Sequence, residues 1–164
     1  DVKAAYDANA SANKTISGLG NETVNLKGAT DANASLVKAI NDYTTGVITL
    51  DTLNTATTGG NFSLSQLGDL KGITGLVNID ADNTVADVIN ISLKDLLAAN
   101  DSKGDIAFLI SGDNLGSDTV AINDYSGWTV DNVAVNQASY TFTNNTTNQE
   151  IVITLTDISG ATVI

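Results

Sequence analysis

The side chains best able to do chemistry in this chain are short acids and amides, grouped in two segments. In the first, Asp80, Asp82 and Asn83 place alternating oxygen atoms directly after an apolar run. Calcium prefers such oxygen ligands. An EF-hand loop would also need a glycine and a later acid where this chain has Val85 and Ile91. An Asx turn that caps a following helix is the competing interpretation.

The second group lies in a glycine-containing loop between two apolar segments. Asp113, Asn114 and Asp118 flank the glycines, and Asp124 follows from the next turn. Two carboxylates and an amide are again suitable oxygen ligands, so calcium is the cofactor that these residues would take. A polar β-turn without any ion explains the same residue types.

The only tryptophan offers a different kind of binding. Trp128 stands three residues after Tyr125 in a strand-like segment. If the two rings are exposed, they can stack on a sugar ring, as aromatic side chains do in carbohydrate-binding modules. If they are buried, they anchor a small β core, which is the usual place of a lone tryptophan in a strand pattern.

Missing residue types exclude several classes of enzyme. The 164-residue chain has no Cys and no His, and all seven basic residues are Lys. Thiolate nucleophiles, Ser-His-Asp triads and Cys/His zinc sites are therefore excluded. No arginine is present to bind phosphate through two hydrogen bonds. A glycosidase-type carboxylate pair remains, but aromatic residues, which usually line such clefts, make up only 5% of the chain. We expect no enzymatic activity.

The charge of the chain limits its partners. The formal net charge is −12, which repels nucleic acid and anionic lipid headgroups and attracts hard cations. No apolar run approaches the length of about 18 residues that membrane insertion needs. A chain without cysteine also suits the outside of a bacterial or archaeal cell. We expect an extracellular or cell-surface location, with no nucleic acid partner and no membrane insertion.

The first half of the chain predicts short elements. Residues 1–14 are polar and predict a linker, a frayed helix or a docking arm, whereas 15–164 predict one β-rich domain with a subdivision near 100–105. Alternation around Gly20 and Asn21 predicts a strand-turn-strand between residues 15 and 26. Leu36, Ile40 and Tyr43 have helical spacing behind a capping Thr or Asp, and residues 47–50 predict a buried strand.

A weaker second copy of this helix and strand follows. Phe62, Leu64, Leu67 and Leu70 predict a short helical turn, and residues 75–80 resemble the strand at 47–51, with a spacing of about 29 residues. The next apolar segment, 85–97, combines a part with strand character and a part with helix character.

From residue 105 onward the pattern is typical of β-structure. Strands are predicted at 106–110, 119–122, 128–135, 139–143, 151–155 and 161–164. The polar run 144–148 predicts a hairpin that spans residues 140 to 155. The last strand would leave an open edge for a neighbouring chain.

Several of these phrases resemble a known class of protein. The C-terminal region of giant repeat adhesins and RTX-type proteins exported by type I secretion is similar to three consecutive phrases: ADVINISLKDLL, FLISGDNLGSDTVAIND and SGWTVDNVAVNQASYTF. Repeats of haemolysin-like surface proteins resemble LVKAINDYTTGVITLDTL. The resemblance covers about residues 30 to 155 and implies an exported, cell-surface protein. The glycine-rich calcium nonapeptide of that class is absent, so its bulk calcium binding is not implied.

Together these observations predict a mainly β fold with a few short helices: a β-sandwich or solenoid-like stack with an antiparallel C-terminal sheet. The expected function is an extracellular structural or adhesive module, stabilised by calcium. A subunit of an S-layer, sheath or extracellular filament, joined by strand pairing, is the alternative. A carbohydrate-binding module is a further alternative. The expected partners are other copies of the chain, neighbouring modules or surface glycans.

Overall fold

The computed structural model describes residues 2–10, 18–30, 32–55, 60–100, 104–113, 117–131, 134 and 137–164. Strands predominate and the helices are few and short, as the sequence predicts. The helices are α1 (Val2–Ala10), α2 (Ala34–Asn41) and α3 (Leu93–Ala98), with the 3-10 turns η1 (Leu64–Leu67) and η2 (Leu70–Gly72). The strands are β1 (Val24–Asn25), β2 (Ile48–Thr49), β3 (Thr52–Asn54), β4 (Gly60–Ser63), β5 (Ile73–Thr74), β6 (Asn78–Asp80), β7 (Asp87–Ser92), β8 (Ile106–Ser111), β9 (Thr119–Asn123), β10 (Trp128–Asp131), β11 (Ser139–Asn144), β12 (Glu150–Thr156) and β13 (Gly160–Val163).

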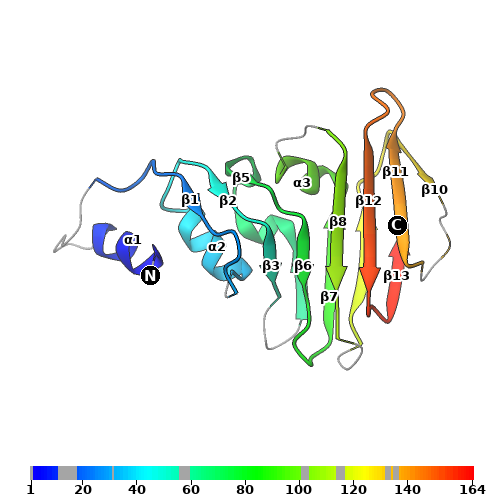
Figure 1. Ribbon diagram of the computed structural model, residues 1–164, viewed down its shortest axis with the longest axis horizontal. Helices are drawn as coiled ribbons and strands as arrows, with labels where there is room; N and C mark the ends of the chain where they lie inside the picture. The colour runs from blue at the N-terminus through cyan, green and yellow to red at the C-terminus, as the bar shows by residue number, and fades with distance from the viewer. Residues whose placement is uncertain are drawn as a thin grey trace.

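The chain winds repeatedly between two main sheets. The larger sheet has the strand order β10-β11-β12-β8-β6-β3, and the second has the order β13-β9-β7-β4. Each of β3, β6, β8 and β12 leads through a turn into the next strand of the second sheet, so every turn adds a strand to both (Figure 1). A small third sheet, β1-β2-β5, lies at the N-terminal end.

The strands of successive turns are in register, so buried residues form columns. Leu53 pairs with Ile79 and Ile79 with Ile110, and all three side chains are fully buried. In the second sheet Phe62 pairs with Ile89, whose other neighbour is Val120. The inward side chains of both sheets belong to one hydrophobic core.

The prediction of an antiparallel C-terminal sheet is correct only for part of this region. β11 pairs antiparallel with β10 and with β12, which confirms the hairpin. However, β12 pairs parallel with β8, and β13 pairs parallel with β9. β10 and β11 are therefore inserted between two turns of the stack, and β12 and β13 add one more turn in the same direction as the earlier ones.

The strand-turn-strand predicted around Gly20 is wrong in its described part. β1 pairs parallel with β2, because Val24 N–H donates to the Val47 carbonyl at 2.8 Å and Leu26 N–H donates to the Thr49 carbonyl at 2.8 Å. The partner of β1 thus comes from the next turn of the chain. Residues 15–17 of the prediction lie outside the described residues.

The predicted helix at Leu36 is present as α2, with a different cap and face. Asn33 is the N-cap, and its side-chain oxygen accepts the Leu36 N–H at 3.0 Å. Val37 and Ile40 form the buried face, whereas Tyr43 lies beyond the helix and is 38% exposed. Among the three structures proposed for the N-terminal segment, the described part forms the helix α1.

α1 is docked on the body of the protein. Tyr6 is only 3% exposed, and its ring stacks on that of Tyr43 with centroids 5.8 Å apart. The Tyr6 hydroxyl donates to the Glu22 carboxylate at 3.3 Å. The position proposed for a subdivision, near 100–105, falls between α3 and β8, and residues 101–103 lie outside the described part.

Candidate functional site

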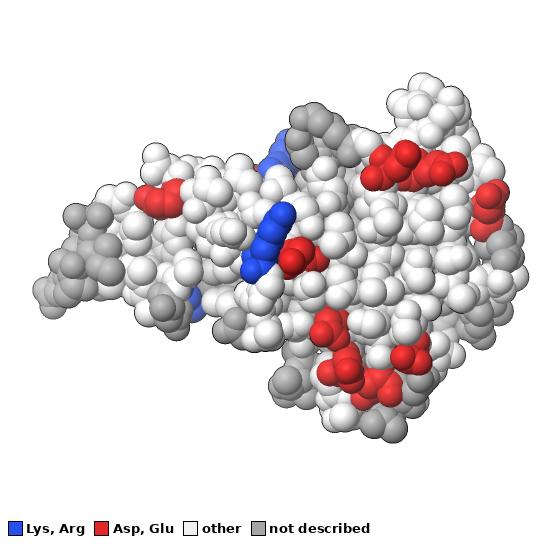
Figure 2. Space-filling view, in the orientation of Figure 1, with Lys and Arg blue, Asp and Glu red and all other residues white. Residues whose placement is uncertain are grey.

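The turns that join the two main sheets gather the polar residues of interest at one end of the strands. Because β3, β6, β8 and β12 are parallel, their carboxyl ends lie together, at the bottom of Figure 1. Acidic side chains gather over this end in Figure 2. The acids of the turns after β6, β8 and β12 include Asp82, Asp113 and Asp157. This end of the stack is the candidate cation site.

A buried carboxylate that the sequence analysis did not single out lies behind these turns. Asp87, the first residue of β7, is 2% exposed. Its Oδ2 accepts hydrogen bonds from the Thr55 hydroxyl at 2.7 Å and from the Asn83 amide at 2.8 Å. These bonds link the turn after β3 to the turn after β6. Asp87 occupies an inward position of an alternating strand, in line with Ile89 and Ile91. A polar residue among inward apolar positions is the feature of the sequence that could have indicated a buried carboxylate here.

Asp118, which the sequence did predict, is buried directly beside Asp87. It is 1% exposed, and its Oδ1 accepts the Asp87 main-chain N–H at 2.9 Å. Its Oδ2 is buried with no hydrogen-bond partner among the described residues. Burial raises the pKa of this carboxyl above its ordinary value, and the nearby charges of Asp87 and Asp113 add to the shift. The main-chain N–H groups of Asp87 and Asp113 oppose it.

The next turn of the chain closes over Asp118. The Asp118 carbonyl accepts the Ser159 N–H at 3.0 Å and the Ser159 hydroxyl at 2.7 Å. A β-carbon built on Gly112 would lie 2.4 Å from Asp118 Oδ2 and 2.7 Å from the Asp157 carbonyl oxygen. The space on this side of Gly112 is therefore already filled, and a residue with a β-carbon would have to displace one of these oxygens.

Asp113 connects this site to the turn after β6. Its Oδ2 accepts the main-chain N–H of Thr84 at 2.6 Å. Thr84 is held at a φ of 64°, a left-handed conformation that a β-branched residue rarely adopts. Of the predicted ligands in the second group, the structure thus brings Asp113 and Asp118 together, and Asn114 lies outside the described residues.

The first predicted group has the geometry of Asx turns. Asp80 Oδ1 accepts the Asp82 N–H at 3.1 Å, and Asn83 Oδ1 accepts the Val85 N–H at 3.1 Å. The segment that follows is the strand β7 and not a helix. Side-chain oxygens of Asp80 and Asn83 are therefore engaged with the main chain. Among the described residues, no three acidic side chains form a ready-made metal cage.

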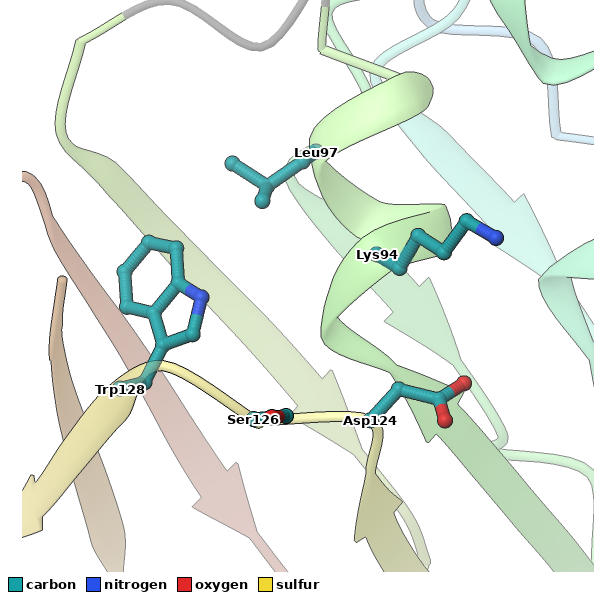
Figure 3. Close-up of a pocket in the computed structure, with 5 residues that line it drawn as sticks. All are labelled: Lys94, Leu97, Asp124, Ser126 and Trp128. Atoms are coloured by element: carbon teal, nitrogen blue, oxygen red, sulfur yellow. The ribbon is translucent and has the colours of Figure 1, made fainter.

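Asp124 is separated from the other predicted ligands. It follows β9, whereas Asp118 precedes it, so the two lie at opposite ends of that strand. Asp124 instead lines a pocket of about 460 Å³ together with Ser126 and Trp128, facing Lys94 and Leu97 of α3. Figure 3 shows Leu97 and Trp128 on one side of this pocket and the charged ends of Lys94 and Asp124 on the other.

The two predicted aromatic residues have different surroundings. Trp128 is half-buried and forms a wall of the pocket. Tyr125 is also half-buried, but its ring contacts that of Phe142, with centroids 6.1 Å apart, and packs against the core. Only Trp128 is placed to contact a small molecule in this pocket.

Comparisons with known proteins add no relatives. No known protein family matches the chain, and neither a curated protein nor a solved structure is detectably similar to it. Within the described part, none of the helices is long and apolar enough to cross a membrane.

Proposed function

We propose that the chain is a non-enzymatic structural or adhesive module of a large exported cell-surface protein, as its resemblance to RTX-type adhesins suggests. The observation that supports this most is the in-register parallel winding over one aliphatic core, exemplified by Leu53, Ile79 and Ile110. This solenoid-like stack gains its rigidity turn by turn, because each turn packs on its neighbours. Such an architecture suits a chain that must hold its shape outside a cell.

The same stack also suits assembly with other copies or with neighbouring modules. Among the described strands, the six-stranded sheet ends at β3 and β10, and the four-stranded sheet ends at β4 and β13. The outer edge of β3 already forms a bridge between Asn54 and Asn33. Edge strands present main-chain groups that can pair with another chain. A self-assembling subunit of an S-layer, sheath or filament is the alternative that these edges favour.

Location and assembly can be tested on the whole chain. An epitope-tagged copy in the source organism should be labelled by antibody on intact cells, and the purified chain should show no turnover of glycoside substrates. Label that appears only after lysis, or measured turnover, would refute the proposal. Sedimentation at rising concentration separates the alternatives, since a module of a longer protein stays monomeric and a self-assembling subunit forms polymers.

A carbohydrate-binding role is the second candidate, favoured by the pocket at Trp128. A half-buried indole beside the polar groups of Lys94, Asp124 and Ser126 combines a stacking surface with hydrogen-bonding groups. Titration with a panel of neutral and acidic monosaccharides should then change the indole fluorescence saturably, and Trp128→Ala should abolish binding measured by calorimetry. A blue-shifted emission that no glycan changes would end this candidate.

A further inference from the structure

Nine tripeptides of the sequence have the form Asn-x-Ser/Thr, which is the acceptor motif for N-linked glycans. They begin at Asn9, Asn13, Asn21, Asn33, Asn61, Asn90, Asn100, Asn144 and Asn145. A chain rich in Asn, Ser and Thr contains several such motifs by chance, so the sequence alone does not select among them. The structure does, because a glycan transferase must reach the amide nitrogen and hold all three residues of the motif.

Four of these asparagines are already engaged within the fold. The side-chain amides of Asn9, Asn90 and Asn100 donate to main-chain carbonyls of other segments, at 3.3, 3.5 and 2.9 Å. Asn33 is half-buried and caps α2. A glycan on any of these side chains would break or crowd contacts that stabilise the fold. Asn13 lies outside the described residues.

Two further asparagines are exposed, but each precedes a residue that the fold holds in place. Asn61 is followed by Phe62, which is 5% exposed and belongs to the core. Asn21 is followed by the half-buried Glu22, whose carboxylate accepts the Gly20 N–H at 2.7 Å. The Glu22 charge would also repel the phosphate of a lipid-linked glycan donor. Neither motif therefore offers three accessible residues to a transferase.

The tip of the hairpin between β11 and β12 is different. Asn145, Thr146 and Thr147 are all exposed, which holds for no other Asn-x-Ser/Thr motif that the structure describes in full. The Thr129 hydroxyl donates to Asn145 Oδ1 at 2.6 Å, so the oxygen end of the amide is fixed on β10. The nitrogen end, Nδ2, makes no hydrogen bond with a described residue and is open to a reagent.

The same tip is uncharged and projects from the body of the protein. Residues 144–149 include no acidic or basic side chain. The hairpin extends beyond the neighbouring turns at the top of Figure 1 and forms an uncharged projection in Figure 2. Asn144 is half-buried, and its Oδ1 accepts the N–H groups of Thr146 at 2.9 Å and Thr147 at 3.0 Å. Asn144 therefore holds the turn, and Asn145 is its accessible acceptor.

We propose that Asn145 is a glycosylation site, at which a transferase attaches a glycan from a polyprenyl phosphate donor. Nδ2 attacks the anomeric carbon of the donor sugar and forms the N–C bond. The bond between that carbon and the phosphate oxygen breaks, and the lipid phosphate leaves with the bonding electron pair. Nδ2 loses one of its two protons to a base of the transferase. The inference rests on the proposed function, because such transferases act on exported chains.

Mass spectrometry of the tagged chain purified from its source organism tests the site. The last Lys of the sequence is Lys103, so the tryptic peptide that begins at Gly104 contains both hairpin motifs and none of the other seven. This peptide should carry the added mass of a glycan. Thr147→Ala destroys the Asn145 motif and should abolish the modification. Thr146→Ala is the matched control, since it destroys only the Asn144 motif and should keep the glycan. Both threonines are exposed, so the two variants should melt at the same temperature.

Failure of the site and failure of the proposed function give different results. A chain that is labelled on intact cells but has an unmodified hairpin peptide would overturn the site and leave the function standing. A glycan that persists in Thr147→Ala and disappears in Thr146→Ala would overturn the choice of Asn145 in favour of Asn144. A modified hairpin on a chain that is labelled only after lysis would support the site and refute the location. An unmodified chain that is labelled only after lysis would overturn both.

Discussion

Truncation of Ile79 to Ala measures how much the buried columns contribute to stability. Ile79 is the middle residue of a column, fully buried between Leu53 and Ile110 on the neighbouring strands. The change removes three carbon atoms worth about 0.8 kcal/mol each, or roughly 2.4 kcal/mol. The cavity left between two fixed neighbours brings the expected loss to about 3 to 4 kcal/mol. For a chain of this size the Tm should fall by about 6 to 16 °C.

Urea unfolding followed by far-ultraviolet circular dichroism and by Trp128 fluorescence is the suitable assay. Val88→Ala is the control, because Val88 lies on the outward face of β7, the next strand along the chain, and is 41% exposed. The Val88→Ala variant should lose less than about 0.5 kcal/mol of unfolding free energy. A loss below about 1 kcal/mol for Ile79→Ala would contradict the tight column. Two separate transitions in the unmodified chain would show that the turns do not share one cooperative core.

Two further predictions concern the N-terminal turns. Gly46→Ala should destabilise the fold by about 1 to 3 kcal/mol in urea unfolding, because the added carbon would lie 2.1 Å from the Glu22 carbonyl oxygen. Gly72→Ala is the control and should cost clearly less, since its added carbon would lie 3.4 Å from the nearest atom. Equal losses of unfolding free energy in the two variants would refute the steric argument. Glu22→Gln should flatten the acid dependence of the Tm. The Gly20 N–H donates to the Glu22 carboxylate at 2.7 Å and lowers the pKa of Glu22 below 4.5. The contribution of the Glu22 carboxylate to stability is therefore present above pH 4.5 and is lost as the pH falls through the lowered pKa. An unchanged Tm slope between pH 5 and pH 3 in this variant would contradict the assignment.

The sequence predicts where most strands lie but not which strands pair. Alternation of apolar residues located β8, β9, β11 and β12 to within a residue or two at each end. Alternation is the same for parallel and antiparallel neighbours, so it carries no information about strand direction. The hairpin between β11 and β12 was predictable because its polar turn is local, whereas the parallel pairing of β12 with β8 joins segments about 45 residues apart in sequence.

The candidate site was predictable in part for a related reason. Asp113 and Asp118 stood out because glycines surround them in one loop, and the structure does bring them together. Asp87 and Thr55 come from other turns of the chain, and only the stacking of turns places Asp87 beside Asp118 and Thr55 beside Asp87. Asp124 was grouped with the loop because it is near in sequence, but the strand β9 carries it to the opposite end of the sheet.

The repeat predicted at a spacing of 29 residues shows what sets the register of the stack. Ile48 pairs with Ile73 and Leu53 with Ile79, so the true offsets are 25 and 26 residues. Apolar residues in strands of two or three residues are too alike to distinguish these offsets from 29. The contacts that distinguish one register from another come from side-chain amides that bind the main chain of a neighbouring turn.

Such amide contacts recur along the N-terminal half of the stack. Asn41 donates to the Leu67 carbonyl at 2.9 Å, and Asn100 donates to the Leu76 carbonyl at 2.9 Å. Asn54 donates to the Thr30 carbonyl at 2.6 Å. A slip of a few residues would break each of these bonds and leave an amide unpaired, so they select one register. These three amides are therefore explained by the winding of the chain and need no ligand, whereas Asn78 Oδ1 and Asp118 Oδ2 are the buried side-chain oxygens of the described residues that have no hydrogen-bond partner.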